Sequence, residues 1–406
     1  MATPLPPSVQ RWLIRDVRVF DGEHVLEQQT VLVEGDAISQ LSGSNFPVVD
    51  AAVIDGRGRT LLPGFFDAHL HLPPDLEPAL HQLVSFGVTT VLDMFSGGSL
   101  LQRVKQLETE DSMDLADVRT AGVGATAPEG ALAQMSPEPL PTISTPDQAD
   151  AWVAARLAEG ADYIKIIYDE QRGGPLSEET VRAIVYAAHR RGALVVVHAL
   201  SEQKARQAIA AGADGLAHLF LGDAASHDFG QFAAAHHVFV IPTLMILAGL
   251  SGEPQATALL ADPYIGPAIP AQQHHMPLRP ADPERHHVYQ AATEAVRQLL
   301  QAQVPLLAGT DTAPITAAFG VGVYGATLHG ELKLLVEAGM TPVQALAAAT
   351  SVPARTFQFS ERGLIRPGMR ADLVLVDGDP TRDILATRHI VAVWKRGMPI
   401  QRNQRM

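Results

Sequence analysis

Two histidines separated by one residue, His69 and His71, are the side chains of this sequence best suited to chemistry. They follow residues 59–68, an apolar segment rich in strand-forming residues. In a β-strand, residues i and i+2 project from the same face, so both imidazoles can point at one ion. Neutral imidazole nitrogen is a common zinc ligand. The pair indicates a metal site, although two solvated histidines at a strand end produce the same pattern.

Further polar residues end apolar, strand-like segments elsewhere in the chain. They are Lys165, His198, His218 and Asp311. In a (β/α)8 barrel the reactive groups project from the C-terminal ends of the strands. A single histidine at a strand end is more often a structural residue than a ligand. Six such residues directed at one barrel mouth favour a shared site.

The elements that must position these residues alternate between helix and strand. Helical segments repeatedly run into a small residue and then an apolar strand, as at residues 83–93, 157–166 and 191–198. Glycine often ends a helix, and a continuous apolar strand is typical of burial on both faces. Eight candidate strands can be counted between residues 62 and 311. The sequence therefore predicts the α/β class, with a (β/α)8 TIM barrel.

Both ends of the chain carry short strands separated by Gly and Asp turns, which is typical of an antiparallel sheet. We expect residues 1–62 and 360–406 to form one small β-sandwich domain and residues 63–359 to form the barrel. Residues 251–290 hold Pro, Gly and the pairs His274-His275 and His286-His287. Their lack of periodicity predicts a lid over the barrel. The histidine pairs suggest either a second metal site or solvated lid residues, and their irregular surroundings favour the latter.

Composition narrows the classes of function. The 406 residues carry a formal net charge of −14, which argues against nucleic acid or anionic membrane as a partner. There is no cysteine, so disulfides, thiolate nucleophiles and cysteine-bound zinc are excluded. The first residues lack a basic region followed by an apolar core, and no apolar stretch is long enough to span a bilayer. These features predict a cytoplasmic protein.

The order of the six residues resembles the metal-dependent amidohydrolase superfamily: H-x-H on strand one, Lys on strand four, His on strands five and six, Asp on strand eight. Residues 160–166 are similar to the G-A-D-x-I-K segment of its imidazolonepropionase-like and Xaa-Pro-dipeptidase-like branch. Residues 308–311, 328–342 and 363–374 also match. The chain departs from many relatives at Ala217 and Leu219, which replace Glu and Gly, and at residues 312–314. These departures weaken any transfer of substrate identity.

The resemblance implies a centre of two divalent metal ions, with zinc the expected metal, although Mn, Co and Fe accept the same ligands. It implies that Lys165 is carboxylated and bridges the two ions. The alternative for Lys165 is an ordinary ion pair, for example with Asp169. The resemblance assigns the inner ion to His69, His71 and Asp311, and the outer ion to His198 and His218.

The implied reaction is hydrolysis of an amide-type C–N bond in a dipeptide, an N-acyl amino acid or an aryl amide. A metal-bridging hydroxide attacks the carbonyl, with Asp311 as the proton shuttle. Tyr168 or His329 could stabilise the oxyanion, although Tyr168 reads equally well as a buried loop aromatic. Arg279 and Arg285 in the lid could bind a substrate carboxylate.

Two alternative functions stay open. The same site could hydrolyse an ester, a carbamate or a phosphotriester, because hydroxide attacks other electrophiles as well. A non-catalytic binding protein on the same fold would be expected to lack a ligand, and none is missing. For partners, we expect a small-molecule substrate, no nucleic acid, no membrane and, by resemblance, a homo-oligomer.

Overall fold

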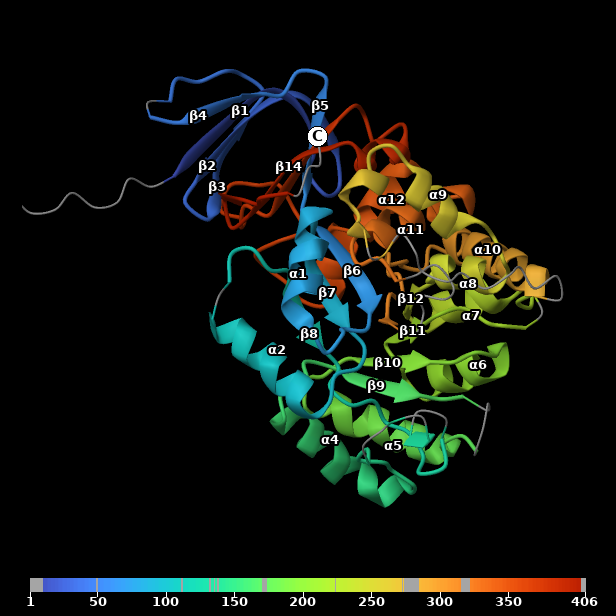
Figure 1. Ribbon diagram of the computed structural model, residues 1–406. Coiled ribbons are helices and arrows are strands. Elements are labelled where there is room, and N and C mark those ends of the chain that lie inside the picture. Colours follow the sequence, from blue (N-terminus) through green and yellow to red (C-terminus); the bar gives the residue numbers. More distant parts are fainter. Residues whose placement is uncertain are drawn as a thin grey trace, which may run out of the picture.

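The computed structural model describes most of the chain (Figure 1). The described residues are 10–48, 50–110, 112–130, 133–134, 136, 139–169, 174–222, 224–271, 273, 285–314 and 322–402. Within them, a sheet built from the two ends of the chain lies beside a larger body of strands and surrounding helices (Figure 1).

The first sheet combines N-terminal and C-terminal strands in the order β15-β14-β13-β5-β1-β2-β3, and β4 pairs with β1. The key link is the antiparallel pairing of β5 with β13, which joins Leu62 to Val374. Alternate side chains such as Ile14, Val31 and Trp394 fill a core on one side of this sheet. Its strands are β1 (Arg11–Phe20), β2 (Val25–Glu34), β3 (Ala37–Ser42), β4 (Ala52–Asp55), β5 (Arg59–Pro63), β13 (Leu373–Asp377), β14 (Ile390–Lys395) and β15 (Met398–Pro399).

The larger body contains parallel strands in two groups, β6-β7-β8 and β12-β11-β10-β9. Nearly every residue of these strands is buried, which explains their continuous apolar sequences. Isolated parallel bridges connect the groups, from Ala125 to Ile166 on one side. The strands are β6 (Phe65–Leu70), β7 (Val88–Asp93), β8 (Asp117–Thr120), β9 (Ile164–Ile167), β10 (Val195–His198), β11 (Gly215–Ala217) and β12 (Phe239–Ile241).

Residues 304–311 were predicted to form the eighth strand. In the structure residues 304–312, all of which are described, carry isolated bridges and form no β-strand. Leu306 bridges to Val240 of β12, and Thr312 bridges to Leu70 of β6. The segment thus lies between the last strand of one group and the first strand of the other. This placement brings Asp311 beside the histidines of β6.

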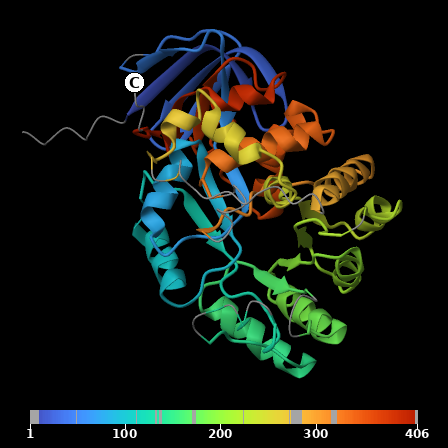
Figure 2. The ribbon, with the colours of Figure 1, turned by 45° about the vertical axis from the view of Figure 1, so that its right-hand side comes forward.

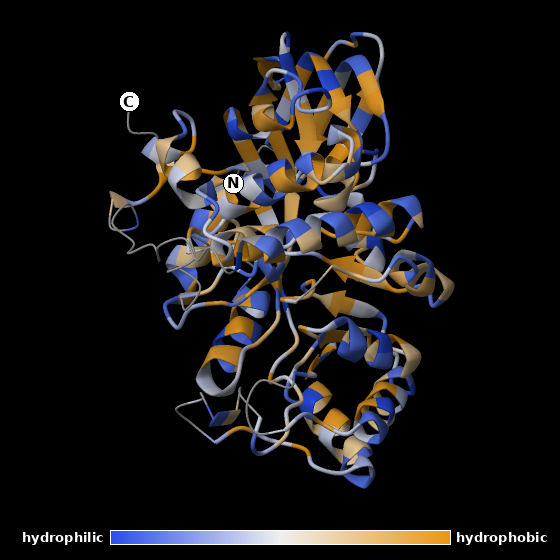
Figure 3. Ribbon diagram, turned by 90° about the vertical axis from the view of Figure 1, so that its right-hand side faces the viewer, coloured by the Kyte–Doolittle hydropathy of each residue, from blue (hydrophilic) through white to orange (hydrophobic). Residues whose placement is uncertain are grey.

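Helices surround these strands (Figure 2), and hydrophobic and hydrophilic residues alternate along them (Figure 3). The buried residues of these helices, such as Leu80 and Val181, are mostly apolar. Several of the helices start at a side-chain cap; Ser201 begins α6 by accepting the N–H of Lys204, only three residues after His198. The α-helices are α1 (Leu76–Ser85), α2 (Gly98–Glu110), α4 (Ala149–Ala158), α5 (Glu178–His189), α6 (Glu202–Ala210), α7 (Phe229–Ala235), α8 (Leu244–Leu250), α9 (Gln255–Ala261), α10 (His286–Gln301), α11 (Ala326–Glu337), α12 (Pro342–Ala348) and α13 (Ser351–Thr356). Short 3-10 helices are η1 (Pro146–Gln148), η2 (Gly266–Ala268) and η6 (Ile384–Arg388).

The stretch 251–290, predicted as a lid without regular structure, contains α9, η2 and the start of α10 in its described part. A seven-residue helix spans only two turns, so its sequence carries too little periodicity to be recognised. His274, His275 and Arg279 lie outside the described residues. Across the described part of the chain, no helix combines the length and apolarity needed to cross a membrane.

Candidate metal centre

The six residues singled out in the sequence lie on the parallel strands, directly after them or, for Asp311, beside them. His69 belongs to β6, Lys165 to β9 and His198 to β10. His218 follows β11 directly, and Asp311 lies beside β6 through the hydrogen bond of its N–H to the carbonyl of His69, at 2.7 Å. Parallel strands end at the same edge, so side chains far apart in sequence converge there.

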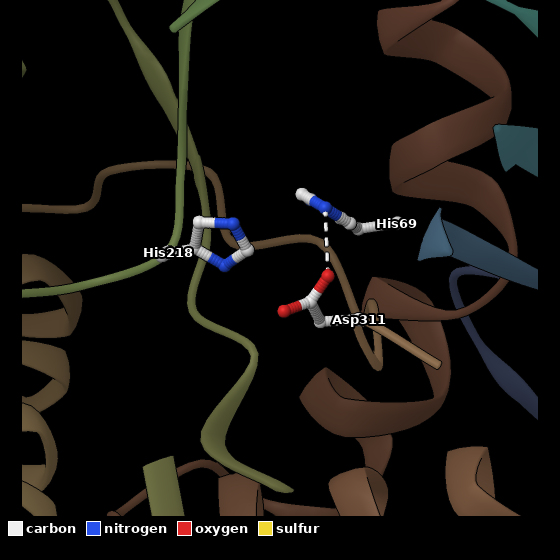
Figure 4. Close-up of side chains that lie close together, drawn as sticks. All are labelled: His69, His218 and Asp311. Carbon is white, nitrogen blue, oxygen red and sulfur yellow. Dashed lines mark ion pairs between the residues drawn. The ribbon is translucent and has the colours of Figure 1, made fainter. Parts of the chain in front are cut away.

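Three of these side chains form a compact group of ligand atoms (Figure 4). One ligand atom each from His69, His218 and Asp311 lies within 4.8 Å of the other two. His69 Nε2 is 3.3 Å and His71 Nε2 is 3.2 Å from the same oxygen, Oδ1 of Asp311. One carboxylate therefore faces two imidazoles, an arrangement that suits a shared cation.

The other two residues flank this group. The ring of His198 packs against His218 with centroids 4.9 Å apart, and His218 packs against His69 at 4.5 Å. Lys165 lies on β9, the strand next to the one that carries His198, and is 2% exposed. Its Nζ has no hydrogen-bond partner among the described residues. A buried amino group without a partner is costly, so this atom is a strong candidate for chemical use.

The ion pair considered for Lys165 with Asp169 is not among the described contacts. Asp169 instead faces His198, with Oδ2 3.9 Å from Nε2. Burial lowers the pKa of Lys165 to about 7. A substantial share of the lysine is therefore a neutral amine near pH 7, which is the form that reacts with CO₂ or another electrophile.

Electrostatics favour neutral histidines and an ionised carboxylate. Burial, and then the nearby Lys165, lowers the pKa of His69 to about 3, and burial lowers the pKa of His218 well below its usual value. Burial opposes ionisation of Asp311, yet His218 and His69 hold its pKa well below the ordinary range. Neutral imidazoles and a carboxylate anion are the protonation states required of metal ligands.

A buried carboxylate beneath the site, Asp67, ties β6 to the segment 304–312. It accepts the N–H groups of His69 and Thr310 at 3.2 and 3.0 Å and the Thr310 hydroxyl at 2.7 Å. Asp67 is completely buried, and burial raises its pKa to about 7. The arrangement fixes the backbone on which His69 and Asp311 stand.

Three residues at this site have a strained backbone. His218, Thr243 and Asp311 have φ values of 72°, 49° and 57°, in the left-handed region that non-glycine residues rarely adopt. Gly309 allows a close approach, because a Cβ there would lie 2.8 Å from His69 Cβ. Strain of this kind is typical of functional sites, where the surrounding packing holds the unfavourable conformation.

The structure does not bring Tyr168 and His329 into this group. The Tyr168 hydroxyl lies 3.0 Å from Gln207 and 3.3 Å from Lys204, both on α6. The ring nitrogens of His329 lie 3.0 Å from the Thr387 hydroxyl and 3.0 Å from the carbonyl oxygen of Phe86. Both side chains are buried and already hydrogen-bonded, so their described contacts point to structural roles.

Sequence reasoning did not select three buried residues that support the ligands: Asp67, Thr243 and Glu331. Asp67 carried a readable signal, because it lies two residues before His69 and so shares its strand face. Thr243 lies two residues after β12, and a threonine at that place in a sequence does not by itself indicate a contact with a ligand. Glu331 stands inside a helix whose packing partner the sequence does not reveal.

Comparison with known proteins places these observations in a family. Residues 60–401 match the model described as the amidohydrolase family. An uncharacterised protein of Mycobacterium tuberculosis is 27% identical over 376 residues, covering 87% of this chain and 88% of that protein. An imidazolonepropionase of Ectopseudomonas mendocina is 27% identical over 413 residues, covering 91% and 92%.

Solved structures extend the likeness to the fold. A Xaa-Pro dipeptidase with bound methionine in its active site has a TM-score of 0.76 at 23% identity, covering 97% of this chain and 100% of that one. A phenylurea hydrolase B has a TM-score of 0.74 at 21% identity, covering 97% of each chain. The fold is therefore a TIM-barrel-like α/β fold, and the predicted resemblance to the imidazolonepropionase-like and Xaa-Pro-dipeptidase-like branch is confirmed.

Proposed function

This chain belongs to the amidohydrolase family, and on that premise we propose that it is a binuclear metal-dependent hydrolase of amide-type C–N bonds. Family membership makes it a hydrolytic enzyme that acts on C–N bonds. The proposal adds the number of metal ions, their ligands and the class of substrate.

The observation that carries the proposal is the group of His69, His218 and Asp311 beside the unpartnered, buried Nζ of Lys165. This donor set fits divalent cations, because it offers neutral imidazoles and an anionic oxygen in a buried place. We assign one ion to His69, His71 and Asp311. The second ion is assigned to His198 and His218.

Lys165 is assigned as a carboxylated lysine that would help to hold both ions. An ammonium group has no lone pair and cannot bind a cation, whereas a carbamate offers two anionic oxygens. Two findings support the modification: the Nζ atom has no hydrogen-bond partner among the described residues, and burial lowers the lysine pKa to about 7. The carbamate would also supply the negative charge that two divalent ions require.

In the proposed reaction Asp311 would transfer the proton, while the metal ions would activate the water and the carbonyl. When bound, two divalent ions would lower the pKa of a water molecule and polarise the scissile carbonyl. Asp311 is an ionised carboxylate with one oxygen 3.2–3.3 Å from two imidazoles, so it can take a proton from the attacking water. Asp311 can then pass that proton to the leaving nitrogen, as a general acid.

An amide-type bond in a dipeptide, an N-acyl amino acid or an aryl amide is the proposed substrate class. The structural neighbours include a Xaa-Pro dipeptidase and a phenylurea hydrolase, which is consistent with C–N cleavage. Esters, carbamates and phosphotriesters remain the alternative class, because the same nucleophile attacks them. Relative kcat/KM across a panel of these substrates separates the two classes.

The test combines metal analysis with turnover. We expect the purified protein to contain about two divalent ions per chain, and we expect chelation to abolish activity until metal is restored. His198→Asn should lose metal and activity. His189→Asn, at a half-exposed histidine paired with Asp214, should lose neither and serves as the matched control. Undiminished activity of the metal-free protein would rule the proposal out.

We also propose that residues 63–359 form a closed barrel and that residues 1–62 and 360–406 form a separate β domain. The bridges from Ala125 to Ile166, from Val240 to Leu306 and from Leu70 to Thr312 support closure. The pairing of β5 with β13 supports the composite domain. In that arrangement the two groups of parallel strands share one ring, and the ligands lie at one mouth.

A further inference from the structure

Helix α8 begins beside the candidate metal centre in a conformation that carries strain. Its N-cap residue, Thr243, has φ 49° and ψ 51°, a left-handed conformation that β-branched residues strongly disfavour. Among the described residues, its hydroxyl accepts no hydrogen bond from an N–H group of the first turn of α8. The hydroxyl lies instead 2.9 Å from Nδ1 of His218. The side chain at the usual capping position is therefore hydrogen-bonded to a histidine of the centre.

Glu331 of α11 supplies the acceptors that a cap would provide. Its two carboxyl oxygens accept the N–H groups of Leu244 and Met245 at 2.9 and 2.8 Å. The first N–H groups of a helix have no partner within the helix, so a buried helix start needs such an acceptor. Glu331 is completely buried. One side chain from a distant helix thus holds the first turn of α8.

We infer that Glu331 and Thr243 are positioning residues that hold His218 in the tautomer and orientation needed to bind a metal ion through Nε2. A proton on Nδ1, donated to the Thr243 hydroxyl, leaves the lone pair of Nε2 free for a metal. This inference rests on the proposed function, because it assigns a task to His218 as a ligand. It extends the site to α11, which contributes no ligand.

The coupling between the two residues follows from the strained backbone. Thr243 keeps its left-handed conformation only while the first turn of α8 stays in place. Removal of Glu331 leaves two buried N–H groups without acceptors, a condition that a protein relieves by moving the segment. The Thr243 hydroxyl would then leave Nδ1, and His218 would lose its fixed orientation.

The experiment measures metal binding in a double-mutant cycle. Zinc affinity and zinc content per chain are determined for T243V, E331A and the double variant, with T243S and E331Q as conservative forms. We expect T243V and E331A each to weaken binding of one zinc ion by about 10–100-fold and to leave the other ion bound. The double variant should be no worse than the stronger single variant, because both changes break one chain of contacts. T243S keeps the hydroxyl and E331Q keeps one acceptor oxygen. Each should therefore lose less zinc affinity than T243V or E331A, respectively.

Two control variants on α11 separate positioning from general destabilisation. Leu334→Ala removes a buried side chain of the same helix, and Lys333→Ala removes a half-exposed one. We expect L334A to lower thermal stability at least as much as E331A while zinc affinity stays at the wild-type value. K333A should change neither.

Distinct results separate failure of this inference from failure of the proposed function. If wild-type protein binds two zinc ions and T243V and E331A bind them equally well, or if their effects add, the inference is overturned. If the wild type binds no zinc, the proposed function fails, and the inference is judged on the metal-free chain. Histidine ¹⁵N NMR, with the His218 signal assigned by H218N, then reports the ring tautomer. Loss of the Nδ1–H form in both variants supports the inference, and an unchanged tautomer overturns it.

Discussion

The two halves of the candidate metal centre are held in different ways. In the backbone-tied half, which contains His69, His71 and Asp311, main-chain hydrogen bonds join β6 to residues 304–312. Four backbone N–H groups donate to carbonyl oxygens of the facing segment at 2.7–3.0 Å: those of Ala68, His71, Thr310 and Asp311. In the side-chain-tied half, which contains Lys165, His198 and His218, main-chain hydrogen bonds also join the strands, as from the His218 N–H to the carbonyl of Ile241 at 3.0 Å. The two histidine rings of this half additionally face single side chains outside the ligand group, Thr243 for His218 and Asp169 for His198.

The difference predicts unequal tolerance to mutation. A hydrogen bond between main-chain groups survives most substitutions, because every residue except proline keeps both groups. A side-chain contact such as that of Thr243 with His218 is lost with one hydroxyl. We therefore expect single substitutions to uncouple ligands more readily in the side-chain-tied half.

The largest effect is expected at Lys165, which would link the two halves. Lys165→Met keeps a long, unbranched apolar stem that is one atom shorter, but it has no amino group and cannot be carboxylated. In the proposed mechanism several kcal/mol of transition-state stabilisation would depend on the metal pair, so kcat/KM should fall by more than about 1000-fold. Steady-state kinetics with parallel metal analysis measure this. Lys105→Met, at a lysine paired with Asp162 on the surface, is the control, and activity of K165M within tenfold of wild type would contradict the prediction.

A smaller effect is expected from the backbone-tied half. Thr310→Val removes the hydroxyl that donates to Asp67, while the N–H groups of His69 and Thr310 still reach the carboxylate. We expect the free energy of unfolding to fall by about 1–3 kcal/mol, with zinc affinity changed less than in T243V. Urea unfolding and zinc titration of the two variants test this. Greater zinc loss in T310V than in T243V would reverse the comparison.

The last prediction is a gradual pH dependence of stability from Glu331, which is spread over several pH units. Burial raises its pKa from 4.5 to about 8, against the opposing pull of the Leu244 and Met245 N–H groups. The folded state then keeps a proton that the unfolded state releases between these values. The free energy of unfolding should therefore decrease as pH rises from 4.5 to 8, by at most about 1.4 kcal/mol per pH unit.

The measurement compares urea unfolding of the metal-free wild type with that of Glu331→Gln across this pH range. Groups common to both proteins cancel in the difference between the two curves. We expect that difference to vary with pH only between 4.5 and 8. A difference that does not change with pH would show that Glu331 is ionised across the whole range from 4.5 to 8. The hydrogen bonds from Leu244 and Met245 would then lower its pKa by as much as burial raises it.

The candidate ligands were easier to select from the sequence than the residues that contact and support them. A polar residue at the end of an apolar strand is conspicuous, so His198 and Asp311 could be found without a structure. Thr243 could not, because the left-handed turn that directs its hydroxyl arises from packing against α11. His329 illustrates the reverse case: it was offered as a residue that could stabilise the oxyanion, but the packing of α11 buries its ring against Phe65 and Phe86.

The fold was predictable where periodicity is strong. Buried parallel strands such as β7 and β10 follow from continuous apolar runs, and the family resemblance supplied their order. Short elements such as α9 were not predicted, because two helical turns contain too few residues to show a hydrophobic periodicity. The eighth strand was expected from an apolar run at residues 304–308, yet the structure gives it only isolated bridges.

The pairing of β5 with β13 has a consequence for the order in which the chain can fold. Until residue 373 leaves the ribosome, β5 lacks one of its two neighbours and is an open, apolar edge strand. Open edges invite pairing with other chains. The contact also spans some 310 residues, so its formation is slow and late. The apolar edge of β5 is therefore open in the nascent chain until β13 has been made and pairs with it.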